Sequence, residues 1–302
     1  MSWSDCVNSF EVKTGWTCTR NDAGLGWWDA KTFILPFKYD RTFIIHQHYS
    51  VFQNQLPTYI QQMASTILIS GAASGLGLAF LIAYAVDESN TIIAVDKNPL
   101  PQGLATKATI HQHLVDVTSE SSILQLAKSL SNIPINIVIH SAGIRGLVHE
   151  AEEAHPDDVA ACETLPVMNL ETLMKTFQIN AAGTFLLLRA LLPNLLLSTD
   201  SKVVVMSSRM GSVGHNSTGS AYAYRASKAA LNAMVRSMSV DVPEVDFILC
   251  HPGRVETNLV RCREEGAVSA EESVEGLLPL IAQWGKKDSG QLYDRFGHPI
   301  VW

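Results

Sequence analysis

The chain has 302 residues, of which 47% are hydrophobic and 17% charged, so it can bury a large core. Its formal net charge of -7, without clustered basic residues, argues against a nucleic-acid-binding protein. The N-terminus lacks the apolar core of a signal peptide and no apolar run reaches transmembrane length, so we expect a cytoplasmic protein with no membrane association.

The cysteine pattern argues against a disulfide-stabilised or zinc-binding protein. The five cysteines are scattered, odd in number and contain no Cys-x-x-Cys pair. Such spacing is typical of reduced thiols in a cytosol. We therefore expect neither a disulfide framework nor a metal site.

The first part of the chain differs in composition from the rest. Residues 1–62 hold four of the six tryptophans and show no sustained helical or strand period. We predict that they form an irregular, poorly structured N-terminal extension, either an inserted flanking segment or sequence not normally part of the protein. Residues 63–302 are then expected to form a single catalytic domain. The tryptophans of the extension favour the alternative, a small satellite cluster.

Short patterns inside the extension carry weaker predictions. Phe33-Ile-Leu and Phe43-Ile-Ile resemble short strands. His46-Gln-His48 offers two metal-ligating side chains, but a stable site needs three or four ligands. We expect these histidines to lie on the surface.

Regular structure is predicted to begin with a strand and a glycine-rich loop. Thr66–Ser70 is a short apolar run, and an apolar helical segment extends from Leu78 to Val86. Glycines between a strand and a helix let the backbone approach a pyrophosphate at the helix N-terminus, although a plain tight turn is the alternative. The loop residues predicted to bind a dinucleotide are Gly71, Ser74, Gly75, Leu76 and Gly77.

A second predicted strand, Thr91–Asp96, ends in a carboxylate close to where a dinucleotide fold places its ribose-binding acid. Asp96 would accept hydrogen bonds from the ribose hydroxyls and repel a 2'-phosphate, which favours NAD over NADP. Lys97 supports the opposite choice, since its ammonium group can meet a phosphate. The alternative for Asp96 is an ordinary turn residue at a strand end.

Two further strands extend the same pattern. Residues 109–115 precede Asp116 and Val117, which we assign to the adenine side of the cofactor site. Residues 136–140 lead into Ala142 and Gly143, whose small size allows a flat ligand to approach the backbone. Strands that alternate with helices predict an α/β fold with a doubly wound parallel sheet, the Rossmann fold, with its ligand over the carboxyl ends of the strands.

The middle of the chain is predicted to contain an acidic loop and then a long helix. Residues 146–170 are expected to form a loop and a short helix, and residues 170–197 a helix interrupted near Pro193. Asn180 lies in this apolar helix. It either bonds a neighbouring backbone carbonyl or holds an ordered water for proton transfer.

A strand of β-branched residues that ends near Ser207 and Ser208 precedes the most informative pair in the sequence. Tyr224 and Lys228 are four residues apart in a helical segment, so the phenol and the ammonium group share one face. A nearby cation favours the phenolate and allows a tyrosine to exchange protons near neutrality. Such a pair also arises by chance, but Tyr222 on the same helix has Ala226 in the partner position.

The last predicted parts are a strand, a turn and a short terminal segment. Residues 246–250 form the strand, and a Pro-Gly turn after it is placed to cap a nicotinamide ring. Residues 289–302 can add an edge strand. The residues assigned to the cofactor in this turn are Pro252, Gly253, Val255 and Thr257.

Taken together, the motifs occur in the order and approximate spacing of the short-chain dehydrogenases/reductases, which the chain resembles from about residue 65 to its end. They are Gly71-x-x-x-Gly75-x-Gly77, Asp96, Asp116, Ala142-Gly143, Asn180, Ser208, Tyr224-x-x-x-Lys228 and Pro252-Gly253 through Thr257. The Ser-Ser-Arg-Met-Gly-Ser run, the Tyr-Ala-Tyr-Arg-Ala-Ser-Lys run and the Gly-x-Pro-Ile-x-Trp ending resemble the C-factor-like, carbonyl-reductase branch. Two positions depart from the usual family pattern. His140-Ser141 stands where Asn-Asn is usual, and Ser70 replaces a threonine whose local hydrogen bond it can keep.

The resemblance implies specific roles. Tyr224 is the expected general acid/base, and Lys228 lowers its pKa and binds the ribose, so both also belong to the cofactor site. Ser208 orients the substrate carbonyl, in preference to Ser207, because the second serine matches the family's catalytic one. Asn180 supports proton transfer.

The expected activity is interconversion of a small-molecule carbonyl and an alcohol with NAD, or with NADP as the alternative. A non-catalytic dinucleotide-binding signalling protein of the C-factor type is the rival function. Apolar side chains on several faces of the helices around Asn180 and after Tyr224 also predict a homodimer or homotetramer, as in related proteins.

Overall fold

The computed structural model describes residues 64–260, 262 and 265–302. The strands and histidines predicted before residue 63 lie outside this range. Among the described residues no helix combines the length and apolarity needed to cross a membrane. The same residues contain no group of three or more His, Cys, Asp or Glu side chains placed to hold a metal ion.

The strands of this part form one parallel sheet in the order β3-β2-β1-β4-β5-β6-β7. The order reverses between β1 and β4, and at such a switch point the loops diverge and leave a crevice at the carboxyl ends of the strands. This arrangement confirms the predicted doubly wound fold. The strands are β1 Thr66–Ser70, β2 Thr91–Asp96, β3 Thr109–Leu114, β4 Ile137–His140, β5 Lys202–Met206, β6 Asp246–His251 and β7 Leu292–Asp294.

The longer helices mostly connect successive strands, and shorter turns lie between them. The α-helices are α2 Gly75–Tyr84, α3 Glu120–Ser129, α4 His149–Ala154, α5 Leu170–Phe177, α6 Thr184–Leu195, α7 Tyr222–Asp241 and α8 Ala270–Gln283. The shorter helical turns are η2 Ala161–Glu163, η3 Gln178–Gly183, η4 Arg209–Gly211 and η5 Lys286–Asp288.

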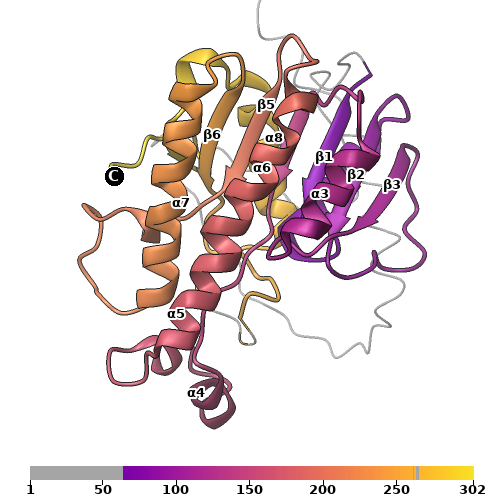
Figure 1. Ribbon diagram of the computed structural model, residues 1–302. Helices are drawn as coiled ribbons and strands as arrows, with labels where there is room; N and C mark the ends of the chain where they lie inside the picture. The colour runs from indigo at the N-terminus through magenta and orange to yellow at the C-terminus, as the bar shows by residue number, and fades with distance from the viewer. Residues whose placement is uncertain (1–63, 261, 263–264) are drawn as a thin grey trace, which may run out of the picture. The chain divides into compact units, whose positions relative to one another are not determined.

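The helices cover both faces of the sheet, as Figure 1 shows for α3, α6 and α7 on the face toward the viewer and α8 behind. Neighbouring residues of each central strand enter different cores. On β1, Leu68 packs in the core with α3, α6 and α7, whereas Ile67 and Ile69 pack in the core with α2 and α8. Burial on both faces explains why these strands are continuous apolar runs in the sequence.

The long helix expected over residues 170–197 is interrupted at a different place. Pro193 lies inside α6, which continues to Leu195, so the expected break near this proline is wrong. The regular helix is instead interrupted by η3, a π-helical turn that contains Asn180. Single π turns inside helices are frequent at functional sites.

Other predicted boundaries differ by a few residues. The first helix begins at Gly75, three residues before the expected Leu78, and ends at Tyr84. The third strand ends at Leu114. The bounds of α3 and α8 were not predicted, although both helices have a serine cap. The Ser119 hydroxyl accepts a hydrogen bond from the Ser122 backbone N–H, and the Ser269 hydroxyl accepts one from the Glu272 backbone N–H.

Candidate active site

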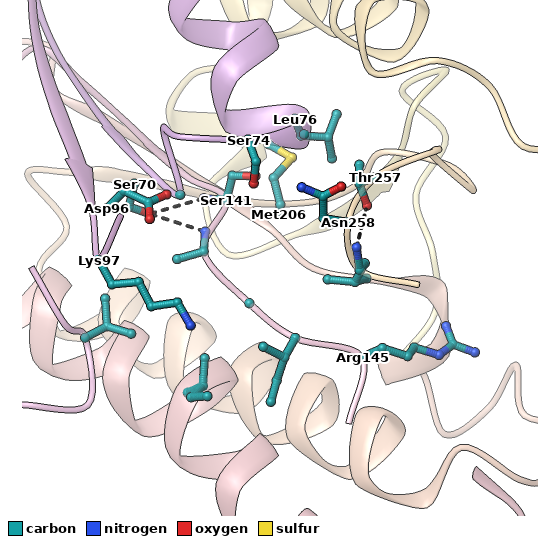
Figure 2. Close-up of a pocket in the computed structure, with 18 of the residues that line it drawn as sticks. Ser70, Ser74, Leu76, Asp96, Lys97, Ser141, Arg145, Met206, Thr257 and Asn258 are labelled. Atoms are coloured by element: carbon teal, nitrogen blue, oxygen red, sulfur yellow. Dashed lines mark hydrogen bonds between the residues drawn. The ribbon is translucent and has the colours of Figure 1, made fainter. Parts of the chain in front are cut away.

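A cavity of about 550 Å³ lies at the carboxyl ends of the strands, and this volume is within the range of ligand sites. Figure 2 shows Asp96 and Lys97 at one end of it and Arg145 at the other. Among the predicted site residues, Gly77 and Asn180 do not line it. Those that do are Gly71, Ser74, Gly75, Leu76, Asp96, Asp116, Val117, Ala142, Gly143, Ser208, Tyr224, Lys228, Pro252, Gly253, Val255 and Thr257.

Gly71 after β1 and Gly77 in the first turn of α2 have no room for a side chain. A Cβ atom on Gly77 would lie 2.0 Å from the carbonyl oxygen of Gly71, and one on Gly71 would lie 2.8 Å from the backbone nitrogen of Ala142. Gly71 also has φ +69, in the left-handed region. The glycines therefore keep the loop flat beneath the N-terminus of α2, whose first N–H groups have no partner inside the helix. A dinucleotide pyrophosphate fits this cradle.

Asp96 has a structural contact in addition to its predicted ligand role. Its Oδ2 accepts a hydrogen bond from the Ala73 N–H at 3.0 Å, and its Oδ1 accepts one from the Asn98 N–H at 2.9 Å. The carboxylate thus holds the glycine-rich loop against the end of β2. Lys97 lines the same end of the cavity. The carboxylate that favours NAD and the ammonium group that favours NADP therefore lie side by side in the chain at this end.

Asp116 lines the cavity at the start of the loop after β3. Its Oδ1 accepts hydrogen bonds from the Thr118 hydroxyl at 2.7 Å and the Thr118 N–H at 2.8 Å. These bonds are the main cause that lowers the pKa of Asp116, and the charge of Lys97 adds to them. Asp116 therefore stays ionised.

Tyr224 and Lys228 lie together on α7, as their spacing predicts. The Lys228 Nζ atom is 5.7 Å from the centre of the Tyr224 ring and donates a hydrogen bond to the Met206 carbonyl at 2.8 Å. Burial lowers the pKa of Lys228 to about 8. The side chain is therefore mostly a cation at neutral pH and can stabilise a nearby phenolate.

The two serines after β5 have different hydrogen bonds. The Ser207 hydroxyl donates to Asn232 Oδ1 at 2.6 Å, which uses its only hydrogen inside the protein. The Ser208 hydroxyl accepts from the Met210 N–H at 3.1 Å and lines the cavity. Acceptance leaves the Ser208 hydrogen available for a ligand, which is consistent with the preference for Ser208.

Asn180 is buried beside the cavity and braces its wall. Its Oδ1 accepts from the Ile144 N–H and its Nδ2 donates to the Ile144 carbonyl, both at 2.8 Å. Nδ2 also donates to Ser227 Oγ at 3.0 Å, and that hydroxyl donates to the Tyr224 carbonyl. Gly143 lies against both Asn180 and Lys228. A Cβ atom on it would be 3.1 Å from Asn180 Oδ1 and 3.8 Å from Lys228 Nζ, so a larger residue would crowd Asn180.

His140 and Ser70, the two departures from the family pattern, bond to each other. The Thr184 hydroxyl donates to the Asn180 carbonyl, so it accepts from His140 Nε2–H at 2.8 Å. His140 Nδ1 then accepts from the Ser70 hydroxyl at 2.8 Å, and Ser70 Oγ accepts from the Ser141 N–H. Burial lowers the pKa of His140 to about 3, so the ring is neutral. A chain of hydrogen bonds therefore joins the end of β1 to the π turn.

A second cavity, of about 840 Å³, adjoins the first. Ser208 and Tyr224 line both cavities, and so does Arg145. Arg145 forms a two-bonded ion pair with Glu163, with both distances 2.8 Å, and its guanidinium lies 4.9 Å from the centre of the Tyr224 ring. A cation near a ring face is attracted to it.

The sequence did not predict the roles of Arg145 and Glu163. Glu163 lies in the stretch expected to be a loop and a short helix, and Arg145 directly precedes that stretch. Their separation of 18 residues matches no local motif. Arg145 directly follows the Ala-Gly-Ile segment after β4, which is the only sequence signal that could have found it.

Comparison with known proteins identifies the family. A model of the short chain dehydrogenase family matches residues 65–267. The "C-signal" of Myxococcus xanthus is 36% identical over 171 residues, which cover 56% of this chain and 93% of that protein. A 1-hydroxy-2-glutathionyl-2-methyl-3-butene dehydrogenase of Rhodococcus is 29% identical over 244 residues, 79% of this chain and all of the other.

A solved structure supports the same assignment. The NADPH-bound carbonyl reductase from chicken fatty liver superimposes with a TM-score of 0.67 and 25% identity, over 80% of this chain and all of that one. The resemblance drawn from the motifs is confirmed, and the chain is an oxidoreductase of the short-chain dehydrogenase family.

Proposed function

We propose that the protein interconverts a ketone or aldehyde and an alcohol with a nicotinamide dinucleotide. The observation that carries the proposal is the position of Ser208 and Tyr224, which line both cavities where the two adjoin. A ligand in the first cavity and a ligand in the second can therefore meet beside one hydroxyl and one phenol.

The residues present fit a dinucleotide in the first cavity. The flat loop of Gly71 and Gly77 and the N-terminus of α2 would hold the pyrophosphate, Asp96 the adenosine ribose, and Lys228 the nicotinamide ribose. When bound, the nicotinamide supplies or accepts hydride.

The protein contributes the proton. Ser208 donates a hydrogen bond to the substrate carbonyl and fixes its direction. Tyr224 gives its phenolic proton to the carbonyl oxygen in reduction and takes it back in oxidation. The ammonium group of Lys228 favours the phenolate, and Asn180 holds the Ile144 and Ser227 contacts around this pair.

For the cofactor we propose NAD, because Asp96 would repel a 2'-phosphate. The counter-argument is Lys97, which lines the same end of the cavity, and the chicken relative holds NADPH. NADP is therefore the alternative, and its use would assign Lys97 to the phosphate.

The direct test is a panel of ketones and aldehydes, offered with NADH and with NADPH and followed by the loss of nicotinamide absorbance. We expect reduction of at least part of the panel, with NADH preferred. Tight cofactor binding with no turnover of any compound, in either direction, would contradict the proposal.

That negative outcome would favour the second candidate function, a dinucleotide-binding signalling protein. Its support is the similarity to the "C-signal" of Myxococcus xanthus, a protein whose name describes a signal. The presence of Ser208, Tyr224 and Lys228 around one cavity favours the enzyme.

We also propose that the protein is a homodimer or homotetramer. Along α5, Leu170, Met174 and Phe177 recur at helical spacing and are 73%, 57% and 36% exposed, although α5 already packs on α7. A second copy would cover this stripe. Light scattering at micromolar concentration should give at least twice the chain mass, and a monomer mass would contradict the proposal.

The extension and the location of the protein remain predictions. We propose that residues 1–62 add little to the catalytic domain and that the protein is cytoplasmic. A shortened chain that begins at Met63 should fold, bind the dinucleotide and keep its turnover. Loss of solubility or of binding in that chain would show the extension to be integral.

A further inference from the structure

The second cavity collects arginines in a protein that is acidic overall. Five of the seven arginines in the described part of the chain line it, and none of the lysines described there does. The formal charge of the whole chain is -7, so composition alone does not explain the cluster. The arginines are Arg145, Arg209, Arg225, Arg254 and Arg295.

Carboxylates of the cavity wall offset only part of this charge. Three acids, Glu163, Glu265 and Asp294, line the cavity with the five arginines. His251 also lines it, and burial lowers the pKa of this histidine to about 4, so the ring is neutral. The lining therefore carries a net positive charge near neutral pH.

Two of the arginines have strong acidic partners. Arg145 is bound through two hydrogen bonds by Glu163, and the side chains of the pair are only 13% and 7% exposed. Arg295 donates to Glu272 at 3.1 Å. These two guanidinium groups are already committed to carboxylates.

Arg209 and Arg225 are held differently. Arg225 donates only to neutral oxygens, the carbonyls of Gly219 and Ser220 and the Thr218 hydroxyl, and no carboxylate of the described residues forms an ion pair with it. Arg209 pairs with Asp294 only at 3.9 Å, and its side chain is 52% exposed. Within the described part of the chain, neither guanidinium has a carboxylate at close hydrogen-bonding distance.

Their places in the chain bring them next to the reacting groups. Arg209 directly follows Ser208, and Arg225 directly follows Tyr224. All four residues line the second cavity. A substrate whose carbonyl lies at Ser208 and Tyr224 therefore extends into a space flanked by two guanidinium groups that have no carboxylate of the described residues closer than 3.9 Å.

We propose that the substrate carries an anionic oxyacid group, a carboxylate or a phosphate, which Arg209 and Arg225 bind while its carbonyl reacts. A guanidinium presents its donors in a planar fork that matches both kinds of anion. The inference rests on the proposed function, because it names the class of molecule that this same site reduces.

The test compares ketones that carry an anionic group with neutral ketones built on the same acetylphenyl ring. Para-acetylbenzoate is paired with its methyl ester, and para-acetylphenyl phosphate with para-acetylanisole, so the two arms separate carboxylate from phosphate. We expect kcat/KM for the better anionic ketone to exceed that of its neutral partner at least about tenfold, the effect of one charged hydrogen bond. Equal values in both pairs would overturn the inference.

Variants assign the effect to residues. Arg209→Gln and Arg225→Gln should each reduce the ratio of kcat/KM between the anionic and neutral ketones about tenfold. Arg189→Gln, on α6 and outside the cavity, is the matched control and should leave the ratio unchanged. A ratio that survives in both cavity variants would also overturn the assignment.

A binding measurement keeps the inference separate from the proposed function. Calorimetry of the same four ketones in the presence of oxidised dinucleotide needs no turnover. If no ketone is reduced but the anion still binds at least tenfold better than its partner, the reductase proposal fails and the anion site stands. If neutral ketones are reduced and bound as well as anionic ones, only the anion site fails.

Discussion

The two cavities that adjoin at Tyr224 are lined by different kinds of segment and by different basic residues. The first is lined by the ends of β-strands and by the short loops that follow them, and its basic side chains are mainly lysines, Lys97, Lys175 and Lys228. The second is lined largely by long loops, and it holds five arginines and none of the described lysines.

The difference has a physical meaning. Lysine is a compact point charge, suited to ribose hydroxyls and to the stabilisation of a phenolate, whereas arginine offers a fork for a planar anion. Under our proposals, the first cavity takes the dinucleotide and the second takes the substrate.

The largest effect is expected at the junction itself. Tyr224→Phe removes the transferable proton and should reduce kcat about 10²- to 10⁴-fold, while dinucleotide affinity changes little. Steady-state kinetics and cofactor titration measure the two quantities. Tyr222→Phe, on the same helix and 38% exposed, is the control. Equal losses in both variants would mean that the wrong tyrosine is assigned.

Beneath the junction, Lys228 should make stability depend on pH. Its pKa is about 8 in the fold against 10.5 for an ordinary lysine, so between these values the unfolded chain holds a proton that the native protein has lost. Native stability therefore rises with pH through this window. Relative to Lys228→Met, the apoprotein should gain up to about 3 kcal/mol between about pH 7 and pH 10, measured by chemical denaturation. A difference independent of pH would contradict the assignment.

Beside the first cavity, in the first turn of α2, position 77 should tolerate no side chain. Gly77→Ala forces a Cβ atom against the Gly71 carbonyl and should cost about 1–3 kcal/mol of unfolding free energy, with weaker dinucleotide binding. Gly276→Ala in α8 is the control, because the new Cβ would have only an ordinary contact at 4.0 Å. Chemical denaturation and cofactor titration measure the two effects. Equal stability and equal dinucleotide affinity in the two variants would contradict the prediction for Gly77.

The smallest effect concerns the choice of cofactor. Asp96→Asn keeps an acceptor for the Ala73 N–H but removes the charge, so preference for NADH over NADPH should narrow about tenfold. Lys97→Ala should weaken mainly NADPH. The dissociation constants of NADH and NADPH, measured for both variants and for the wild-type protein, test these two expectations. A wild-type protein that already prefers NADPH would refute the role of Asp96.

The first cavity was largely predictable from the sequence. The bounds of β1 and β2 follow from apolar runs that are buried on both faces, and the glycines and Asp96 lie directly at strand ends. Local pattern and motif spacing are enough where neighbours in the chain are also neighbours in space.

The second cavity could not be predicted in this way. The contact of Arg145 with Glu163 and Tyr224 joins residues 18 and 79 positions apart, and it depends on how long loops close over the sheet. The π turn at Asn180 has a similar origin, since its side chain satisfies the backbone of Ile144 on another segment. Tertiary contacts of this kind leave no local sequence period.

The most direct test of the central claim is transfer of a labelled hydride. Wild-type protein would be given the panel of ketones and aldehydes with reduced dinucleotide that carries deuterium at both C4 positions of the nicotinamide ring, and the products would be analysed by mass spectrometry and NMR. The account predicts an alcohol with deuterium on its carbinol carbon and a hydroxyl proton from Tyr224 that exchanges with water. Product without deuterium, or no reduced product from any compound, would contradict it.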